Sequence, residues 1–112
     1  METKTMFSQH TEGGYKTLLE GIEMKTLVHG EKTLMSEFFL HKGFKLPLHA
    51  HPHEQTGYLV RGHLRFVVAG EEIDALPGDS WCIAGNVEHG ANILEDSIVI
   101  EVFSPVREEY LP

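Results

Sequence analysis

The chain has 112 residues, an apolar fraction of 41% and a formal charge of −8, the balance of 9 basic and 17 acidic side chains. This length fits one domain over 1–112 and leaves little room for a second. Because an acidic chain repels phosphate backbones, and this one has no Lys/Arg cluster, nucleic acid is not an expected partner.

Short segments with the periodicity of β-strands follow one another from residue 22 onwards, separated by Gly and other turn residues. The expected strands and extended segments cover 22–28, 33–40, 45–51, 56–60, 63–69, 73–76, 81–83, 87–94 and 98–103. The expected turns lie at 30–32, 42–43, 61–62, 69–72, 76–79, 85–86 and 95–97. No long stretch repeats apolar residues at the roughly 3.6-residue spacing of a helix. This pattern predicts an all-β sandwich or barrel.

The two ends of the chain have weaker patterns than the middle. We expect the core of the domain to lie within 21–103. The first 15 residues are expected to be either a disordered end or a strand that is added to the sheet edge of a partner. No element is predicted for the tail that begins at Ser104.

A cluster of histidines is the first sign of chemistry. Three of the eight histidines fall at alternate positions: His49, His51 and His53. Residues two apart in a strand point to the same face, so His49 and His51 can direct their imidazoles to one point, whereas Pro52 interrupts the row before His53. Gln55 follows after a short loop, and His89 is the best distant candidate to complete a metal site. The alternative is a solvated histidine-rich loop.

The segment from Glu101 to Glu108 is the second informative stretch. Glu101 and Phe103 share one strand face, and if that face is the interior, Glu101 is a buried carboxylate able to act as a general acid or base. Arg107 could return over a barrel mouth and bind a substrate carboxylate with its planar guanidinium. Taken alone, these residues favour a simpler arrangement, in which the strand ends in an exposed tail and both side chains are solvated.

The spacing around the histidines resembles the first motif of the cupin superfamily, G-x5-H-x-H-x3/4-E-x6-G. Here the pattern begins at Gly43, passes through His49, His51 and Gln55, and ends at Gly62. This resemblance implies a cupin-type double-stranded β-helix, or jelly-roll barrel, and one divalent metal ion. The implied ligands are His49, His51, Gln55 and His89.

A second, degraded motif supports the same resemblance. Gly78 and His89 keep the spacing of the cupin pattern G-x5-P-x-G-x2-H-x3-N. Its Pro and its second Gly are replaced by Ala84 and Asn86, and Asn92 falls one place before the expected Asn. The two motifs together place the resemblance over about 21–103.

Gln55 departs from the family pattern, which usually has Glu at this position. A neutral amide leaves the full charge of a divalent ion uncancelled, so the site is expected to attract an anionic ligand. Three imidazoles and one amide oxygen suit Zn, Fe, Ni, Mn or Cu. In the alternative interpretation, Gln55 only donates or accepts a hydrogen bond beside the ion.

The string from Glu101 to Glu108 is similar to the Asp-Val-Phe-Ser-Pro-x-Arg-Glu ending of small cupins that act in pectin and alginate breakdown. Those proteins open the ring of 4,5-unsaturated uronates to give the linear keto-uronate. The resemblance implies that Gln55 is a metal ligand, that Glu101 stands at the family's Asp, and that Arg107 matches its Arg. Glu101 moves the carboxylate by about one methylene, and such a shift at a reacting centre can be costly.

These residues leave three functions open. The first is a metal-dependent enzyme acting on a small acidic sugar derivative, with Glu101 and Arg107 as catalytic residues. The second is an oxygen-dependent metal dioxygenase. The third is a non-catalytic cupin that binds a metal or a small ligand.

Location and assembly are predicted from weaker signals. Cys82 is the only cysteine, which suits a reducing cytoplasm. The N-terminus lacks the apolar region of a signal peptide, and no apolar run reaches the roughly 20 residues of a membrane span. We therefore expect a cytoplasmic protein without membrane contact. The resemblance and the need to protect edge strands imply a homodimer, formed by a sheet face or by exchanged strands.

Overall fold

The structure, a computed structural model, describes residues 5–112. Its elements in chain order are β1 (Lys16–Leu19), β2 (Ile22–His29), β3 (Leu34–Leu40), β4 (Lys45–His49), β5 (Glu54–Val68), β6 (Glu71–Ala75), β7 (Ser80–Ile83), β8 (His89–Ser104) and the short 3-10 helix η1 (Glu108–Tyr110). No helix of this described part is long and apolar enough to span a membrane.

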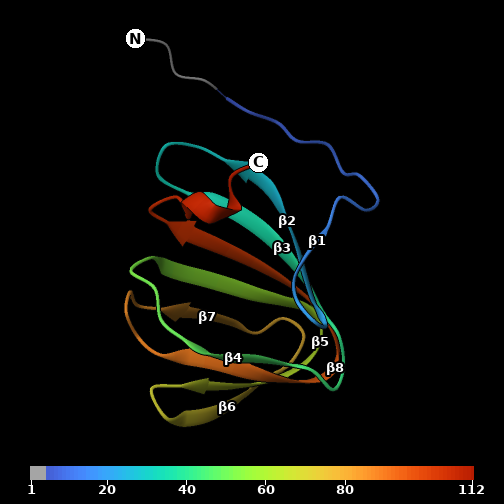
Figure 1. Cartoon of the computed structure of the whole chain (residues 1–112), viewed down its shortest axis with the longest axis vertical. Helices are drawn as coiled ribbons and strands as arrows, with labels where there is room; N and C mark the ends of the chain where they lie inside the picture. Colours follow the sequence, from blue (N-terminus) through green and yellow to red (C-terminus); the bar gives the residue numbers. More distant parts are fainter. Residues whose placement is uncertain (1–4) are drawn as a thin grey trace.

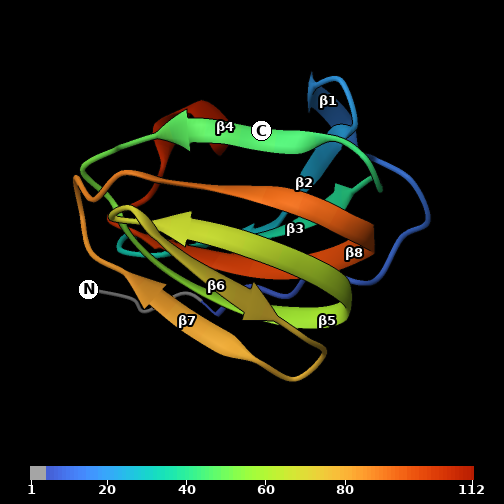
Figure 2. The same ribbon diagram turned by 90° about the horizontal axis from the view of Figure 1, so that it is seen from below.

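Two long strands, β5 and β8, pair with each other along their lengths and belong to both sheets of the barrel (Figure 1). The first half of β5 and the second half of β8 form one sheet in the order β1-β2-β3-β8-β5-β7. Their other halves form a second sheet in the order β4-β8-β5-β6. Figure 2 shows both long strands bending, so that the sheets enclose an interior. The predicted all-β jelly-roll barrel is confirmed.

Alternating side chains of the strands fill the interior. On β3, Leu34, Phe38 and Leu40 are buried and point inward with Ser36, while Met35 between them is partly exposed. Each fully buried large apolar side chain stabilises a fold by about 1.5–3 kcal/mol. The same two-residue period that predicted the strands therefore also forms the core.

Two predicted turns, at 61–62 and 95–97, are wrong. Both segments lie inside the long strands β5 and β8, at the place where these strands bend together. A Cβ on Gly62 would lie 2.1 Å from Ser97 Oγ, and the φ of Gly62 is +110°, so only glycine fits this crossing. The pairing register shifts on both sides of it. The turn-forming residues thus produce a bulged bend that carries each strand from one sheet to the other.

The ends of the chain are more structured than the sequence indicates. β1 was not predicted, and it pairs with β2 of its own chain as an edge strand. Residues 5–15 contain no strand. After β8 the chain returns over the barrel, where Tyr110 in η1 is buried against Phe38 and Phe103. The simpler interpretation of this segment as an exposed tail is wrong.

Candidate metal centre

Three histidines meet at one end of the barrel. His49 ends β4 and pairs with His89, the first residue of β8, while His51 lies in the loop between β4 and β5. One ligand atom from each imidazole lies within 4.8 Å of the other two. His51 and His89 are buried. The structure thus brings together the three histidines that the sequence nominated as metal ligands.

Hydrogen bonds orient two of these imidazoles for metal binding. The Nδ1–H of His49 donates to the carbonyl of Pro47 at 2.9 Å, and the Nδ1–H of His89 donates to that of Val87 at 2.8 Å. This tautomer leaves each Nε2 with a free lone pair, and the buried Nε2 of His89 has no partner among the described residues. Burial lowers the pKa of His51 and of His89, which favours the neutral form that binds metals. The donor set therefore fits a divalent transition metal.

Gln55 lies beside the histidines on β5 with its amide oriented. Its Oε1 is 2.7 Å from His51 Nε2, and its Nε2 donates to Glu101 Oε2 at 3.2 Å. The carbonyl oxygen therefore faces the histidines and the NH2 group faces the carboxylate. This placement suits both a ligand to the ion and a hydrogen-bonding neighbour of it.

Glu101 points into the barrel from β8 and is only 6% exposed. The indole Nε1–H of Trp81 donates to its Oε1 at 3.1 Å, while Gln55 donates to the other oxygen. Burial raises the pKa of Glu101 to about 7, against the opposing effect of these two hydrogen bonds. The interpretation of Glu101 as a solvated carboxylate is therefore wrong.

Arg107 returns over the same cavity. Its guanidinium lies 5.1 Å from the ring centre of Phe103 and 4.4 Å from that of Tyr110, and its Nε is 3.3 Å from Glu109 Oε2. Its side chain is 13% exposed. Burial, and then the positive charge of Arg107, lower the pKa of His51. It too is not a solvated tail residue.

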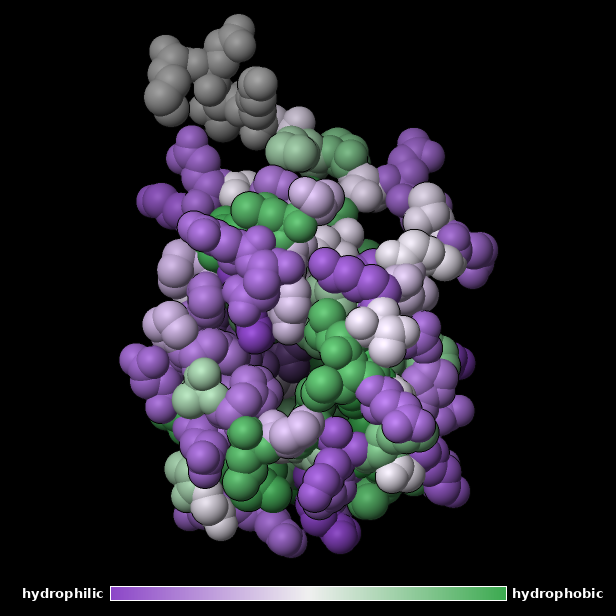
Figure 3. Space-filling view, in the orientation of Figure 1, coloured by the Kyte–Doolittle hydropathy of each residue, from purple (hydrophilic) through white to green (hydrophobic). Residues whose placement is uncertain are grey.

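These groups surround a cavity of about 390 Å³ between the two sheets. The polar part of its lining comes from His49, His89, Gln55, Glu101, Arg107 and Glu109. The rest is mainly apolar and includes Leu18, Leu46, Leu64 and Val99. Figure 3 shows the molecule hollowed near the middle of one face, with hydrophobic residues along one side of the hollow and hydrophilic ones along the other. Such a cavity suits a small polar ligand held at one end.

Sequence patterns missed several residues of this region. Tyr110 and Glu109 follow the last predicted strand, and no periodicity marks them. No motif marks Trp81, yet its indole donates a hydrogen bond to Glu101. Cys82 is exposed, because it occupies the outward position next to Trp81 on β7.

The fold and the site define a small β-barrel protein with three histidines placed to bind a metal. The model of the cupin domain family matches residues 36–103, and the chain belongs to this family.

Solved structures share this fold. KdgF from Halomonas sp. has a TM-score of 0.90 and 31% identity, and the match covers 96% of this chain and 100% of that one. An RmlC-like cupin from Shewanella frigidimarina has a TM-score of 0.89 and 28% identity, with coverage of 99% and 100%. The resemblance to a small cupin of the pectin-breakdown type is thereby confirmed. No curated protein matches the chain.

Proposed function

We propose that this cupin is a metal-dependent enzyme that opens the ring of a small 4,5-unsaturated uronate to give the linear keto-uronate. One observation carries the proposal: the buried carboxylate of Glu101 and the guanidinium of Arg107 line the same cavity as His49 and His89 of the histidine cluster. The similarity to KdgF over nearly the whole chain supports it.

The reaction needs an anion-binding group and an acid–base group. In ring opening, the anomeric hydroxyl loses its proton, the bond between C1 and the ring oxygen breaks, and the resulting enolate becomes a ketone when C4 is protonated. No atoms are gained or lost. Glu101, whose pKa lies near neutrality, would take the first proton and supply the second. Arg107 would hold the substrate carboxylate.

The cofactor that we propose is one divalent transition metal: Zn, Fe, Ni, Mn or Cu. His49, His51 and His89 would hold it, with the Oε1 of Gln55 as the fourth ligand. When bound, the ion would supply positive charge next to the anionic ligand. Because Gln55 is neutral, no protein carboxylate among these four ligands reduces that charge.

The ultraviolet absorbance of the conjugated enol acid gives the test. Metal-loaded protein should consume an unsaturated galacturonate, and Glu101→Gln should lower the rate by about 10²-fold or more, the typical loss on removing a general acid–base group. Glu95→Gln is the matched control, because Glu95 lies on the same strand but is exposed. Decay no faster than that of His51→Ala would contradict the proposal.

Two further results would point to the alternatives. Tight binding of the uronate without conversion would identify a non-catalytic binding protein. Turnover that stops when oxygen is removed would identify a dioxygenase. Oxygen-independent turnover would exclude the dioxygenase.

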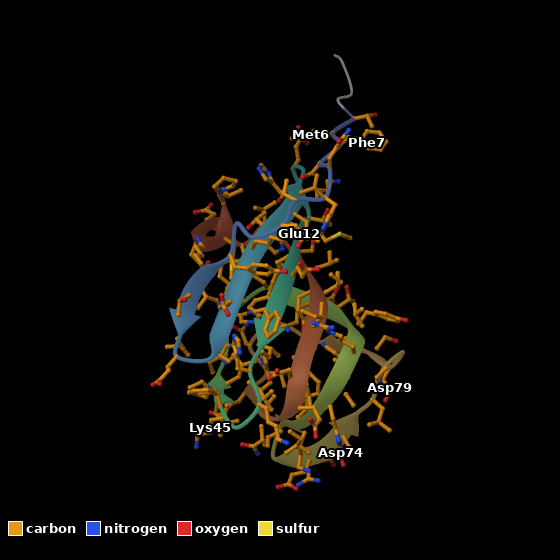
Figure 4. The ribbon with its side chains drawn as sticks, turned by 90° about the vertical axis from the view of Figure 1, so that its right-hand side faces the viewer. Met6, Phe7, Glu12, Lys45, Asp74 and Asp79 are labelled. Carbon is orange, nitrogen blue, oxygen red and sulfur yellow. The ribbon has the colours of Figure 1, made fainter. Side chains whose placement is uncertain are left out.

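We propose that the protein is a homodimer whose interface is the outer face of the β3-β8-β5 sheet. This face carries several exposed apolar side chains: Met35, Tyr58 and Val60 are 38%, 48% and 46% exposed, and Ile100 and Val102 lie on β8 between β3 and β5. Apolar patches of this kind mark protein contacts. Figure 4 shows Met6 and Phe7 on an N-terminal segment that extends away from the barrel. We propose that the two subunits of the dimer exchange this segment.

The remaining expectations concern domain and location. We propose that residues 1–112 form a single domain, which the shared core from Ile22 to Tyr110 supports. We also propose a cytoplasmic location, which the exposed and unpaired Cys82 supports because an oxidising compartment would modify it. Fractionation of cells that express the protein would test the location.

A further inference from the structure

Three residues lie in one row across three neighbouring strands of the first sheet. Gly57 on β5 pairs with Glu101 on β8 at one side and with Trp81 on β7 at the other. Neighbouring strands are about 4.8 Å apart, so β7 and β8 are separated by about twice that distance. A side chain from β7 can reach one from β8 only by crossing the strand between them.

Gly57 leaves the space for this crossing. A Cβ at position 57 would lie 2.1 Å from Trp81 Nε1 and 2.3 Å from Trp81 Cε2, far inside contact distance. The indole therefore lies over the backbone of β5 where a side chain would otherwise stand. Glycine within a strand is destabilising by about 0.5–1 kcal/mol relative to alanine, and it often marks a close approach of this kind.

The crossing gives each oxygen of Glu101 its own donor. Trp81 Nε1–H donates to Oε1 at 3.1 Å and Gln55 Nε2–H donates to Oε2 at 3.2 Å, which fixes the plane of the carboxylate. Phe66 supports the indole, with ring centres 4.6 Å apart. Since the NH2 group of Gln55 is held by Glu101, its carbonyl oxygen is directed at His51.

We propose that Trp81 is a positioning residue, admitted by Gly57, which fixes the carboxylate of Glu101 and thereby keeps the Gln55 carbonyl oxygen facing the histidine cluster. Trp81 does not line the cavity in the described chain, so it acts through Glu101 and not on a ligand. Its effect on turnover rests on the proposed function. Its effect on geometry does not.

The single tryptophan of the chain makes the hydrogen bond directly observable. In a ¹⁵N–¹H spectrum, the one indole N–H resonance of the wild type should be displaced by its carboxylate acceptor. Glu101→Gln should move it, and Gly57→Ala should move it towards the position of a solvated indole, whereas Glu95→Gln should leave it in place. A resonance at the same position in all four proteins would overturn the proposal.

A cobalt(II) titration tests the effect on Gln55. Trp81→Phe keeps the ring and removes the donor, so the cobalt-loaded variant should still bind the ion through its histidines. Its visible absorption should differ from that of the wild type, because the Gln55 amide is free to turn. An unchanged spectrum would show that Trp81 does not orient Gln55, and it would overturn that half of the proposal.

Kinetics supply the third test. Trp81→Phe and Gly57→Ala should each lower kcat by about tenfold, as the loss of one hydrogen bond to a charged group predicts, with KM changed less than twofold. The double variant should be no slower than either single variant, because both changes remove the same hydrogen bond from Trp81 to Glu101. Additive losses, or a rise in KM alone, would contradict the positioning role. If Gly57→Ala does not fold, Trp81→Phe still decides the outcome; if the wild type does not open uronates, the two spectroscopic tests remain.

Discussion

The length of the Glu101 side chain matters because it reaches two donors at once. The cupins of pectin and alginate breakdown that this sequence resembles have aspartate at this position. Its side chain is shorter by one methylene, or about 1.5 Å. From the same backbone position it would lose one or both of the hydrogen bonds from Trp81 and Gln55. In this chain the acidic residue and its two donors therefore form one matched set.

We accordingly expect Glu101→Asp to lower kcat by about 10- to 100-fold although the charge is conserved, because the carboxylate is displaced from the reacting centre. The ultraviolet ring-opening assay measures this. The metal content of the variant should equal that of the wild type, which separates misplacement from loss of the ion. Wild-type activity in Glu101→Asp would contradict the idea that the length of the Glu101 side chain is matched to the positions of its two donors.

The histidines permit a prediction that compares two close neighbours. His89→Ala removes a buried imidazole whose Nε2 has no partner among the described residues. The variant should bind zinc at least about 100-fold more weakly, because the loss of a residue that only supports a metal ligand already costs up to about 100-fold. His53→Ala is the matched control, because His53 lies outside the cluster although its ring is 5.5 Å from that of His51. Zinc titration with a competing chelator gives both affinities. Equal losses in the two variants would place the ion elsewhere.

At the scale of elements, sequence periodicity predicted the strands from β2 to β8 but missed β1, and it did not predict how long β5 and β8 are. Gly62 and the segment 95–97 have the composition of turns, and in isolation they would end a strand. They continue through the bend only because β5 and β8 lie against each other there, where Ser97 Oγ accepts a hydrogen bond from the backbone of His63. Such a contact between segments distant in sequence leaves no trace in local composition.

The N-terminal segment is tied to the outside of the β2-β3 pair by one small network. Lys25 donates to the carbonyls of Thr11 and Gly13 at 2.8 and 3.1 Å and lies over the ring of Tyr15. The hydroxyl of Tyr15 donates to Glu37. Burial, and then the hydrogen bond and charge of Glu37, raise the pKa of Tyr15 to about 12.

This raised pKa predicts a late tyrosine titration. Because the folded state keeps the phenol proton beyond the ordinary pKa of about 10, the stabilisation from Tyr15 is complete below pH 10 and is lost as the pH rises through about 12. The difference in absorbance at 295 nm between the wild type and Tyr15→Phe should therefore show one tyrosinate that forms with a midpoint near 12. A midpoint near 10 would mean that the N-terminal segment does not hold Tyr15 in this place.

At the scale of the whole molecule, motif spacing located most of the site. The spacing of His49, His51 and His89 follows the cupin pattern, although β4 ends at His49 and His51 reaches the cluster from the loop that follows. The burial of Glu101 and the return of Arg107 could not be derived from the residues alone, since either strand face could have been the inner one. Trp81 was the hardest to foresee, because its contact with Glu101 depends on the pairing of three strands.

The proposed dimer gives a prediction for the assembled protein. Val60→Glu places a charge on the apolar outer face and should convert a dimer to a monomer, as light scattering after size exclusion would show. Ile73→Glu is the control, because Ile73 is similarly exposed, at 53%, but lies on β6 in the other sheet. A wild type that is already monomeric would rule out the interface.

The bend shared by β5 and β8 also has a mechanical consequence. Each of these strands bends where Gly62 meets Ser97, so its two halves lie in opposite sheets with the cavity between them. His49 and His89 belong to one sheet, while Gln55 and Glu101 belong to the other. An ion held by residues of both sheets would cross-link them at the ends far from the bend. The ligands that would bind the ion would therefore also oppose the opening of the barrel.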